Sequence, residues 1–262
     1  MSPTPVPTAP DFDSLEAVSV EPDVYTQTVR ANAPVRNRLL SLEPPRPTRT
    51  YAPVSNIALY QQAIRAIDNA GMQIIDELWT SAFKDQVMTC RLIIKTPDSD
   101  LSRTLAFGNS YNKMRSVQFA AGATVMACAN GVFMGDVSTF KRRHHHGNYD
   151  RINHAAEYQV ENLVREFERI KMLQEKLQNR VLTIEGAAAI GGVIAKRGIL
   201  TPHMLADYFR ELDESQNFAF HDNKGTAWMA YNNMTQALKR SNGFNIISKH
   251  QLLTEAMQEL VN

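Results

Sequence analysis

The sequence predicts an α+β fold, in which an antiparallel sheet-rich N-terminal half packs with a helix-rich C-terminal half containing one long amphipathic helix. Short apolar stretches separated by turn residues fill the region from Met72 to Ala129, and the hydrophobic period becomes helical near Asn153. Residues 1–49 instead carry nine of the twelve prolines. We therefore expect a proline-rich arm over residues 1–50 and a single α+β nucleic-acid-binding domain over residues 51–262.

The arm is expected to be extended or disordered, because proline interrupts helices and removes a backbone donor from a sheet. We expect it to contribute nothing to the core, although Val29 to Leu42 can form a short helix interrupted at Pro34. The N-terminus lacks the basic and apolar regions of a secretory signal, and no apolar run approaches the roughly 18 residues that span a bilayer. The sequence thus indicates a cytoplasmic protein without a membrane partner.

The compact part is predicted to begin with a helix that Ser55 caps and that stops at Gly71. Five stretches with β-branched or aromatic residues then have the length and composition of antiparallel strands. They are Met72 to Trp79, Gln86 to Lys95, Thr104 to Gly108, Ser116 to Ala121 and Thr124 to Ala129.

The C-terminal half begins with the long amphipathic helix, expected from His154 to Val181. Its apolar stripe consists of Val160, Leu163, Val164, Phe167, Ile170, Leu177 and Val181. Used as a dimer seam, the same stripe would make a homo-oligomer, but it suits a domain core better. Further helices are predicted at Gly186 to Lys196, Pro202 to Leu212 and Thr226 to about Lys239.

Catalytic signatures are absent from the sequence: it contains no phosphate loop, dinucleotide turn, nucleophile elbow or HExxH helix. The glycine-rich stretch from Gly186 to Gly198 matches none of these spacings, so we interpret it as close helix packing. Cys90 and Cys128 lie in apolar runs and are expected to be reduced core thiols. We therefore expect a non-enzymatic protein without a cofactor.

Charge is distributed unevenly along the chain, although the total is only +1. Residues 1–29 hold five acids and no bases, and residues 30–151 hold sixteen bases and nine acids, a net charge of +7. Residues 152–262 hold twelve bases and thirteen acids. Phosphate binding depends on such local excess more than on the total, so the middle of the chain is the candidate for it.

Within this part, the segment from Arg103 to Arg151 interleaves bases with aromatic residues. Single strands are bound by this combination, because cations follow the phosphates while aromatic rings stack on unpaired bases. Phe119 and Phe133 are expected in the core, whereas Tyr111 and Tyr149 lie in polar, glycine-containing stretches typical of exposed turns. The candidate nucleic-acid-binding residues are Arg103, Tyr111, Lys113, Arg115, Lys141, Arg142, Arg143, Tyr149 and Arg151.

The histidines His144, His145 and His146 admit a second interpretation as ligands of a transition metal. Adjacent histidines on an extended loop point in different directions, and the neighbouring Lys141 to Arg143 oppose a dication. We favour phosphate contact by this loop, so no metal is expected.

Four short motifs resemble, in this order, a phage and plasmid family of domains of unknown function. They are Gly108 to Tyr111, Cys128 to Gly131, Arg143-His144 with Gly147-Asn148, and Tyr231-Asn232 with Thr235. The resemblance covers about residues 51–240. The histidines inserted after Arg143 depart from the usual form of the third motif.

In size and layout the chain is also similar to Drc-type single-stranded DNA-binding early-transcription regulators of N4-related phages. This resemblance implies a host-cytoplasmic phage protein that coats single strands and supports early transcription by a phage RNA polymerase, its partner. Our prediction is therefore binding of single-stranded DNA without sequence specificity. The alternatives are a strand-annealing recombination protein and a metal-dependent nuclease that uses His144 to His146.

Overall fold

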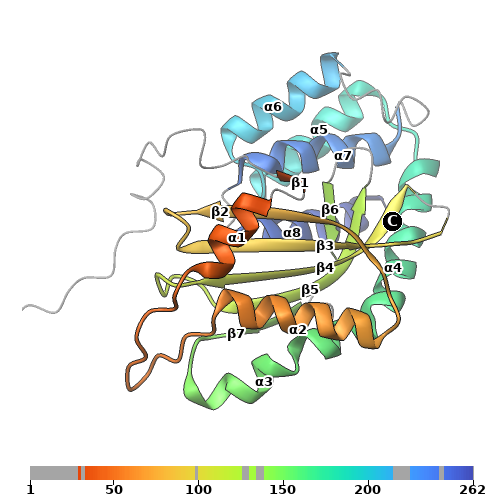
Figure 1. Cartoon of the computed structure of the whole chain (residues 1–262). Coiled ribbons are helices and arrows are strands. Elements are labelled where there is room, and N and C mark those ends of the chain that lie inside the picture. Colours follow the sequence, from red (N-terminus) through yellow and green to blue (C-terminus); the bar gives the residue numbers. More distant parts are fainter. Residues whose placement is uncertain are drawn as a thin grey trace, which may run out of the picture.

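The computed structural model describes residues 29–30, 33–97, 100–125, 130–133, 139–214, 225–241 and 245–261. Within these ranges an antiparallel sheet occupies the centre of the molecule, and Figure 1 shows helices around it. This arrangement confirms the predicted α+β class. The strands are β1 (Val29–Arg30), β2 (Ile74–Ala82), β3 (Val87–Ile94), β4 (Leu101–Ser110), β5 (Val117–Val125), β6 (Asn130–Phe133) and β7 (Thr139–Arg142).

The sheet places its seven described strands in the order β1-β2-β3-β4-β5, followed by two short strands on the free edge of β5. β6 pairs with the second half of β5, where Gly122 lies opposite Phe133. β7 pairs with the first half, where Phe119 lies opposite Phe140. The expected strands Ser116 to Ala121 and Thr124 to Ala129 are wrong as separate elements, because Val117 to Val125 is one continuous strand.

One face of the sheet carries most of its large apolar side chains. Phe107 and Phe119 pack as tilted rings with centres 5.7 Å apart, as part of a core with α1 (Ala33–Ser41), α2 (Asn56–Asn69) and α4 (Ala155–Asn179). Cys90 is a free, buried thiol in this core, as predicted, whereas Cys128 lies outside the described residues. On the opposite face, Ala106 and Ala120 contact Ile247 of α8 (Ile246–Val261).

The helix α1 contradicts the expectation that residues 1–50 contribute nothing to the core. Val35 and Leu39 are buried in the cluster that also holds Leu59 and Phe107. Pro34 lies in the first turn of α1, where proline is tolerated because its missing N–H has no helical partner.

The helix-rich half is organised by α4, whose apolar stripe joins two core clusters. Leu163 packs under the sheet, while Phe167 and Ile170 belong to a second cluster with Trp228 and Tyr231. This second cluster is built by α5 (Ile184–Lys196), α6 (Pro202–Glu214), α7 (Ala227–Ala237) and α8. Two residues of the predicted stripe, Val164 and Val181, are exposed instead.

The glycine-rich stretch in α5 does serve close helix packing. A Cβ added to Gly191 would lie 2.3 Å from Cε1 of Tyr208, so α6 approaches the α5 backbone directly. The Tyr208 hydroxyl donates a hydrogen bond of 2.8 Å to the Ala187 carbonyl, which fixes the ring there.

Ser55 caps α2 as predicted, and Thr226, where a helix was expected to begin, caps α7 in the same way. Ser55 and Thr226 accept hydrogen bonds from the backbone N–H of Ala58 and Met229, at 3.2 and 3.3 Å. The helix α8 and the short strand β7 were not predicted. Over the described ranges, no helix combines the length and the apolar character that crossing a membrane requires.

Candidate functional site

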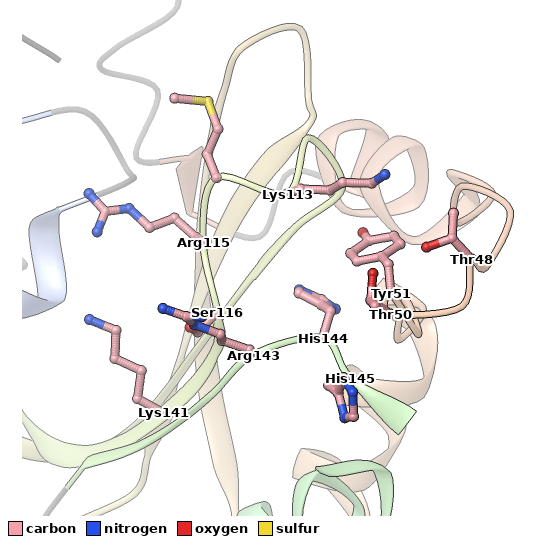
Figure 2. A pocket seen from close by; sticks show the side chains of 11 residues that line it. Thr48, Thr50, Tyr51, Lys113, Arg115, Ser116, Lys141, Arg143, His144 and His145 are labelled. Carbon is pink, nitrogen blue, oxygen red and sulfur yellow. The ribbon is translucent and has the colours of Figure 1, made fainter. Parts of the chain in front are cut away.

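A cavity of about 620 Å³ opens beside the turn that joins β4 to β5 (Figure 2). Three segments that are distant in sequence form its wall: the chain before α2, the β4–β5 turn, and β7 with the residues that follow it. The lining residues are Thr48, Thr50, Tyr51, Lys113, Met114, Arg115, Ser116, Lys141, Arg143, His144 and His145.

The charge of this wall has a single sign. Lys113, Arg115, Lys141 and Arg143 all contribute to it, and no carboxylate is among the eleven lining residues, all of which the structure describes. Four cations around one hollow, without an acid to neutralise them, concentrate a positive potential there. The cavity therefore has the electrostatic character of an anion-binding site.

Strand alternation explains which bases of the Lys141-Arg142-Arg143 run enter the cavity. Phe140 and Arg142 point to the core side, where Phe140 packs under the sheet and the Arg142 guanidinium lies 5.2 Å from its ring centre. Lys141 and Arg143 point the opposite way and line the cavity. The run was predicted to act as a unit, but the structure divides it.

A small hydrogen-bond network fixes the β4–β5 turn, which carries Lys113 and Arg115. The Asn112 side-chain oxygen accepts bonds from the Ser110 hydroxyl at 2.7 Å and from the Met114 N–H at 3.1 Å. Lys113, between them, has a φ of 64°, a left-handed conformation that is uncommon outside glycine and asparagine. The Arg115 guanidinium donates to the side-chain oxygen of Asn245, which lies just before α8.

Tyr111 does not have the role predicted for it. It is only 5% exposed, and its hydroxyl accepts a hydrogen bond of 2.8 Å from the backbone N–H of Asn56. The preceding Asn109 donates to the carbonyl of Val54 at 2.8 Å and to the side-chain oxygen of Asn56 at 2.7 Å. These residues hold the chain before α2 against the turn, so their contribution to the cavity is structural.

Tyr51 and His144 form the corner of the cavity opposite Arg115 (Figure 2). Their ring centres are 5.4 Å apart, and the Lys113 ammonium lies 4.8 Å from the centre of the Tyr51 ring, which is a cation–π contact. Burial raises the pKa of Tyr51 to about 12 and lowers that of His144 to about 4, so both are neutral at pH 7. Neither the Tyr51 hydroxyl nor either His144 ring nitrogen has a hydrogen-bond partner among the described residues.

The remaining candidate residues lie elsewhere. The Arg103 guanidinium lies 5.3 Å from the ring centre of Phe167, and Arg103 does not line the cavity. Arg142 and Arg151 are exposed outside the cavity, and the side chain of Tyr149 lies outside the described residues. Phe119 is in the core as expected.

Sequence reasoning missed Tyr51, which it placed at the start of the compact domain without counting it among the candidate binding residues. The one signal for it was an isolated aromatic residue after a polar, proline-rich stretch. Its position depends on contacts that no local pattern shows, such as the bond from the Ala52 N–H to the His144 carbonyl.

The three histidines do not converge on one point. His144 is buried beside Tyr51, the exposed His146 bonds the Thr48 carbonyl through Nε2 at 3.1 Å, and Nδ1 of His145 accepts from the Gly147 N–H at 3.1 Å. Within the described ranges, no three His, Cys, Asp or Glu side chains are grouped to hold a metal ion.

Comparison with known proteins finds one family. Residues 68–258 match the family described as Domain of unknown function (DUF932). The matched stretch includes the four cations of the cavity but not Tyr51. No curated protein and no solved structure matches the chain.

Proposed function

Because the chain belongs to the DUF932 family, whose description names no activity, we propose from the cavity itself that the protein binds single-stranded DNA without sequence specificity. The observation that carries this proposal is the convergence of Lys113, Arg115, Lys141 and Arg143 on a cavity without an acidic residue. Such a wall suits the phosphates of a nucleic-acid backbone, because each contact releases a condensed counterion and adds no base preference.

The shape of the site favours one strand over two. The cations line a hollow of about 620 Å³ between three segments, and do not form a flat or convex stripe. A flexible single strand can bend its phosphates into such a hollow, whereas a stiff, base-paired duplex cannot. Phosphate contact, and not base stacking on Tyr111, is therefore the basis of the binding that we propose.

The biological role that we propose follows from the resemblance to Drc-type regulators: a phage protein that supports early transcription in the host cytoplasm, with a phage RNA polymerase as its partner. A protein that only coats strands needs no metal and no catalytic group. We accordingly propose a non-enzymatic function.

The test is a set of binding titrations with single-stranded DNA, duplex DNA and RNA of equal length, each over a range of salt concentrations. We expect the single strand to bind more tightly than the duplex, with an affinity that falls linearly in log–log form as salt rises. Duplex binding that equals or exceeds single-strand binding would refute the proposal. Adding magnesium and a complementary strand to the same reactions detects the two alternatives, because cleavage indicates a nuclease and accelerated pairing an annealing protein.

A further inference from the structure

One corner of the cavity offers hydrogen-bonding groups that a phosphate does not require. His144 lines the cavity and is only 6% exposed, yet both of its ring nitrogens are buried without a partner among the described residues. Native proteins leave few buried polar side chains unpaired, so each such group calls for an explanation. Because this imidazole lies in the wall of a cavity, a molecule bound there can supply the missing partner.

The state of this imidazole defines the chemistry of that partner. Burial holds the pKa of His144 at about 4, so the ring is uncharged at pH 7 and offers one N–H donor and one nitrogen acceptor. A phosphodiester oxygen can only accept, and the cavity already holds four cations for it. The acceptor nitrogen of His144 therefore needs a hydrogen-bond donor, which a phosphodiester cannot supply.

In a DNA strand, only one kind of group meets this requirement. The oxygens of an internal deoxyribose are all bound in phosphodiester or ring linkages, so the sugar has no donor. The edges of the bases carry both donors and acceptors, and in single strands they are unpaired. A volume of about 620 Å³ lies within the roughly 300–1,000 Å³ typical of small-molecule pockets, so a base can enter with its phosphate.

We propose that the cavity receives one whole nucleotide of the bound strand, its phosphate against Arg115, Lys141 and Arg143 and its base edge hydrogen-bonded to His144. This inference rests on the proposed function and adds to it that the strand is anchored by an inserted base. The base does not stack on the face of Tyr51 that Lys113 covers. Instead, Tyr51 forms the wall beside the inserted base and keeps the Lys113 ammonium at the rim of the cavity.

The test distinguishes contacts to the base from contacts to the phosphate backbone. It changes the DNA ligand and the protein separately. The two ligands are an oligothymidylate and an oligomer of the same length made of abasic deoxyribose phosphates, which keeps the phosphates and sugars. The two variants are His144→Leu, which removes both nitrogens at similar volume, and His144→Gln, which retains a donor and an acceptor. Thermal melts of each variant check that it is folded.

For the wild type, we expect the intact strand to bind about tenfold more tightly than the abasic strand, which corresponds to about 1.4 kcal/mol. His144→Leu should abolish this difference by weakening only the intact strand, and His144→Gln should preserve most of it. Since no cation changes, the dependence on salt should be the same for all three proteins. If His144→Leu does not fold, the comparison of the two strands on the wild type decides alone.

Three results would overturn the inference in distinguishable ways. Equal, salt-dependent affinity of the wild type for both strands would reject the inserted base while leaving phosphate binding intact. No salt-dependent binding of either strand would reject the proposed function itself. An RNA strand of the same length serves as a third ligand: an advantage of RNA over DNA that disappears in His144→Leu would assign the imidazole to a ribose hydroxyl and reject the base contact.

Discussion

The backbone N–H of Ala52 donates a hydrogen bond to the carbonyl oxygen of His144, with 3.2 Å between nitrogen and oxygen. This bond joins the chain before α2 to the chain after β7, next to the two aromatic rings that form one corner of the cavity. The neutral corner and the cationic wall are thus held by one framework, and they can be changed separately by substitution.

Because Lys141 and Arg143 line the cavity and Arg142 does not, we expect their substitution to change DNA binding by different amounts. Lys141→Ala with Arg143→Ala removes two cations from the cavity, whereas Arg142→Ala with Arg151→Ala removes two exposed cations outside it. At roughly 0.7 per phosphate contact, the first pair should make the slope of log affinity against log salt shallower by about 1.4. The second pair should change it by much less. Equal effects would mean that general surface charge, and not the cavity, binds the strand.

Tyr111→Phe tests the structural role of the buried tyrosine. The substitution removes the hydroxyl that accepts from the Asn56 N–H, so an unpaired donor should lower the free energy of unfolding by about 1–3 kcal/mol. The dissociation constant for single-stranded DNA should remain within about twofold of the wild-type value. Urea unfolding and binding titrations on one preparation measure both. Unchanged stability with weakened binding would instead support the sequence-based prediction that Tyr111 is exposed and stacks on bases.

Two adjacent glycines of α5 should respond to alanine in opposite directions. Gly191→Ala places a methyl group against the fixed ring of Tyr208, which should destabilise the protein by about 1–3 kcal/mol. Gly192→Ala meets no atom within 4 Å and should stabilise the helix by about 0.5–1 kcal/mol. Thermal unfolding of the two variants gives the comparison. Similar shifts in both would contradict the close contact of α5 with α6.

Buried histidines make the fold sensitive to acid. Burial lowers the pKa of His144 to about 4, and burial with the charges of Arg91 and Lys239 lowers that of His250 to about 3. The unfolded chain binds protons at these positions near pH 6.5, so their contribution to stability is present above that pH and is lost as pH falls towards 4 and 3.

Each histidine should add up to about 1.4 kcal/mol per pH unit to the slope of stability between pH 6.5 and its folded pKa. His144→Gln and His250→Gln should each make this slope shallower, whatever their effect on stability at pH 7. Urea unfolding over a pH series measures the slope. A slope unchanged in both variants would show that other groups control the acid response.

The sequence predicted the parts of this structure that depend on local pattern. Ser55 was identified as a cap, and Thr226 as the start of a helix, from residue type and position alone. Charge counting pointed to the segment that supplies Lys113 and Lys141 to the candidate site. Tyr111 was misread because its polar neighbours are typical of an exposed turn. Here the turn is covered by another part of the chain, which contributes Asn56.

The sequence neighbours of a residue do not predict whether distant segments of the chain will bury it. This applies to His144, which was grouped with two histidines that are exposed in the structure. It applies equally to Tyr51, whose environment comes from Lys113 and His144. Their positions depend on long-range pairing of β7 with β5, which short apolar patterns did not reveal.

Strand β7 has a consequence for how this protein can vary between lineages. Its even-numbered positions, Phe140 and Arg142, face the core side, and Lys141 lies between them on the cavity side. A one-residue slip against β5 would exchange the two sets, bringing charge under Phe119 and a phenyl ring into the cavity. Point substitutions of Lys141 can therefore change the cavity wall alone, whereas insertion or deletion of one residue within Thr139–Arg142 would disturb the core and the cavity together. We expect related proteins to keep the length of β7, so that Phe140 stays opposite Phe119.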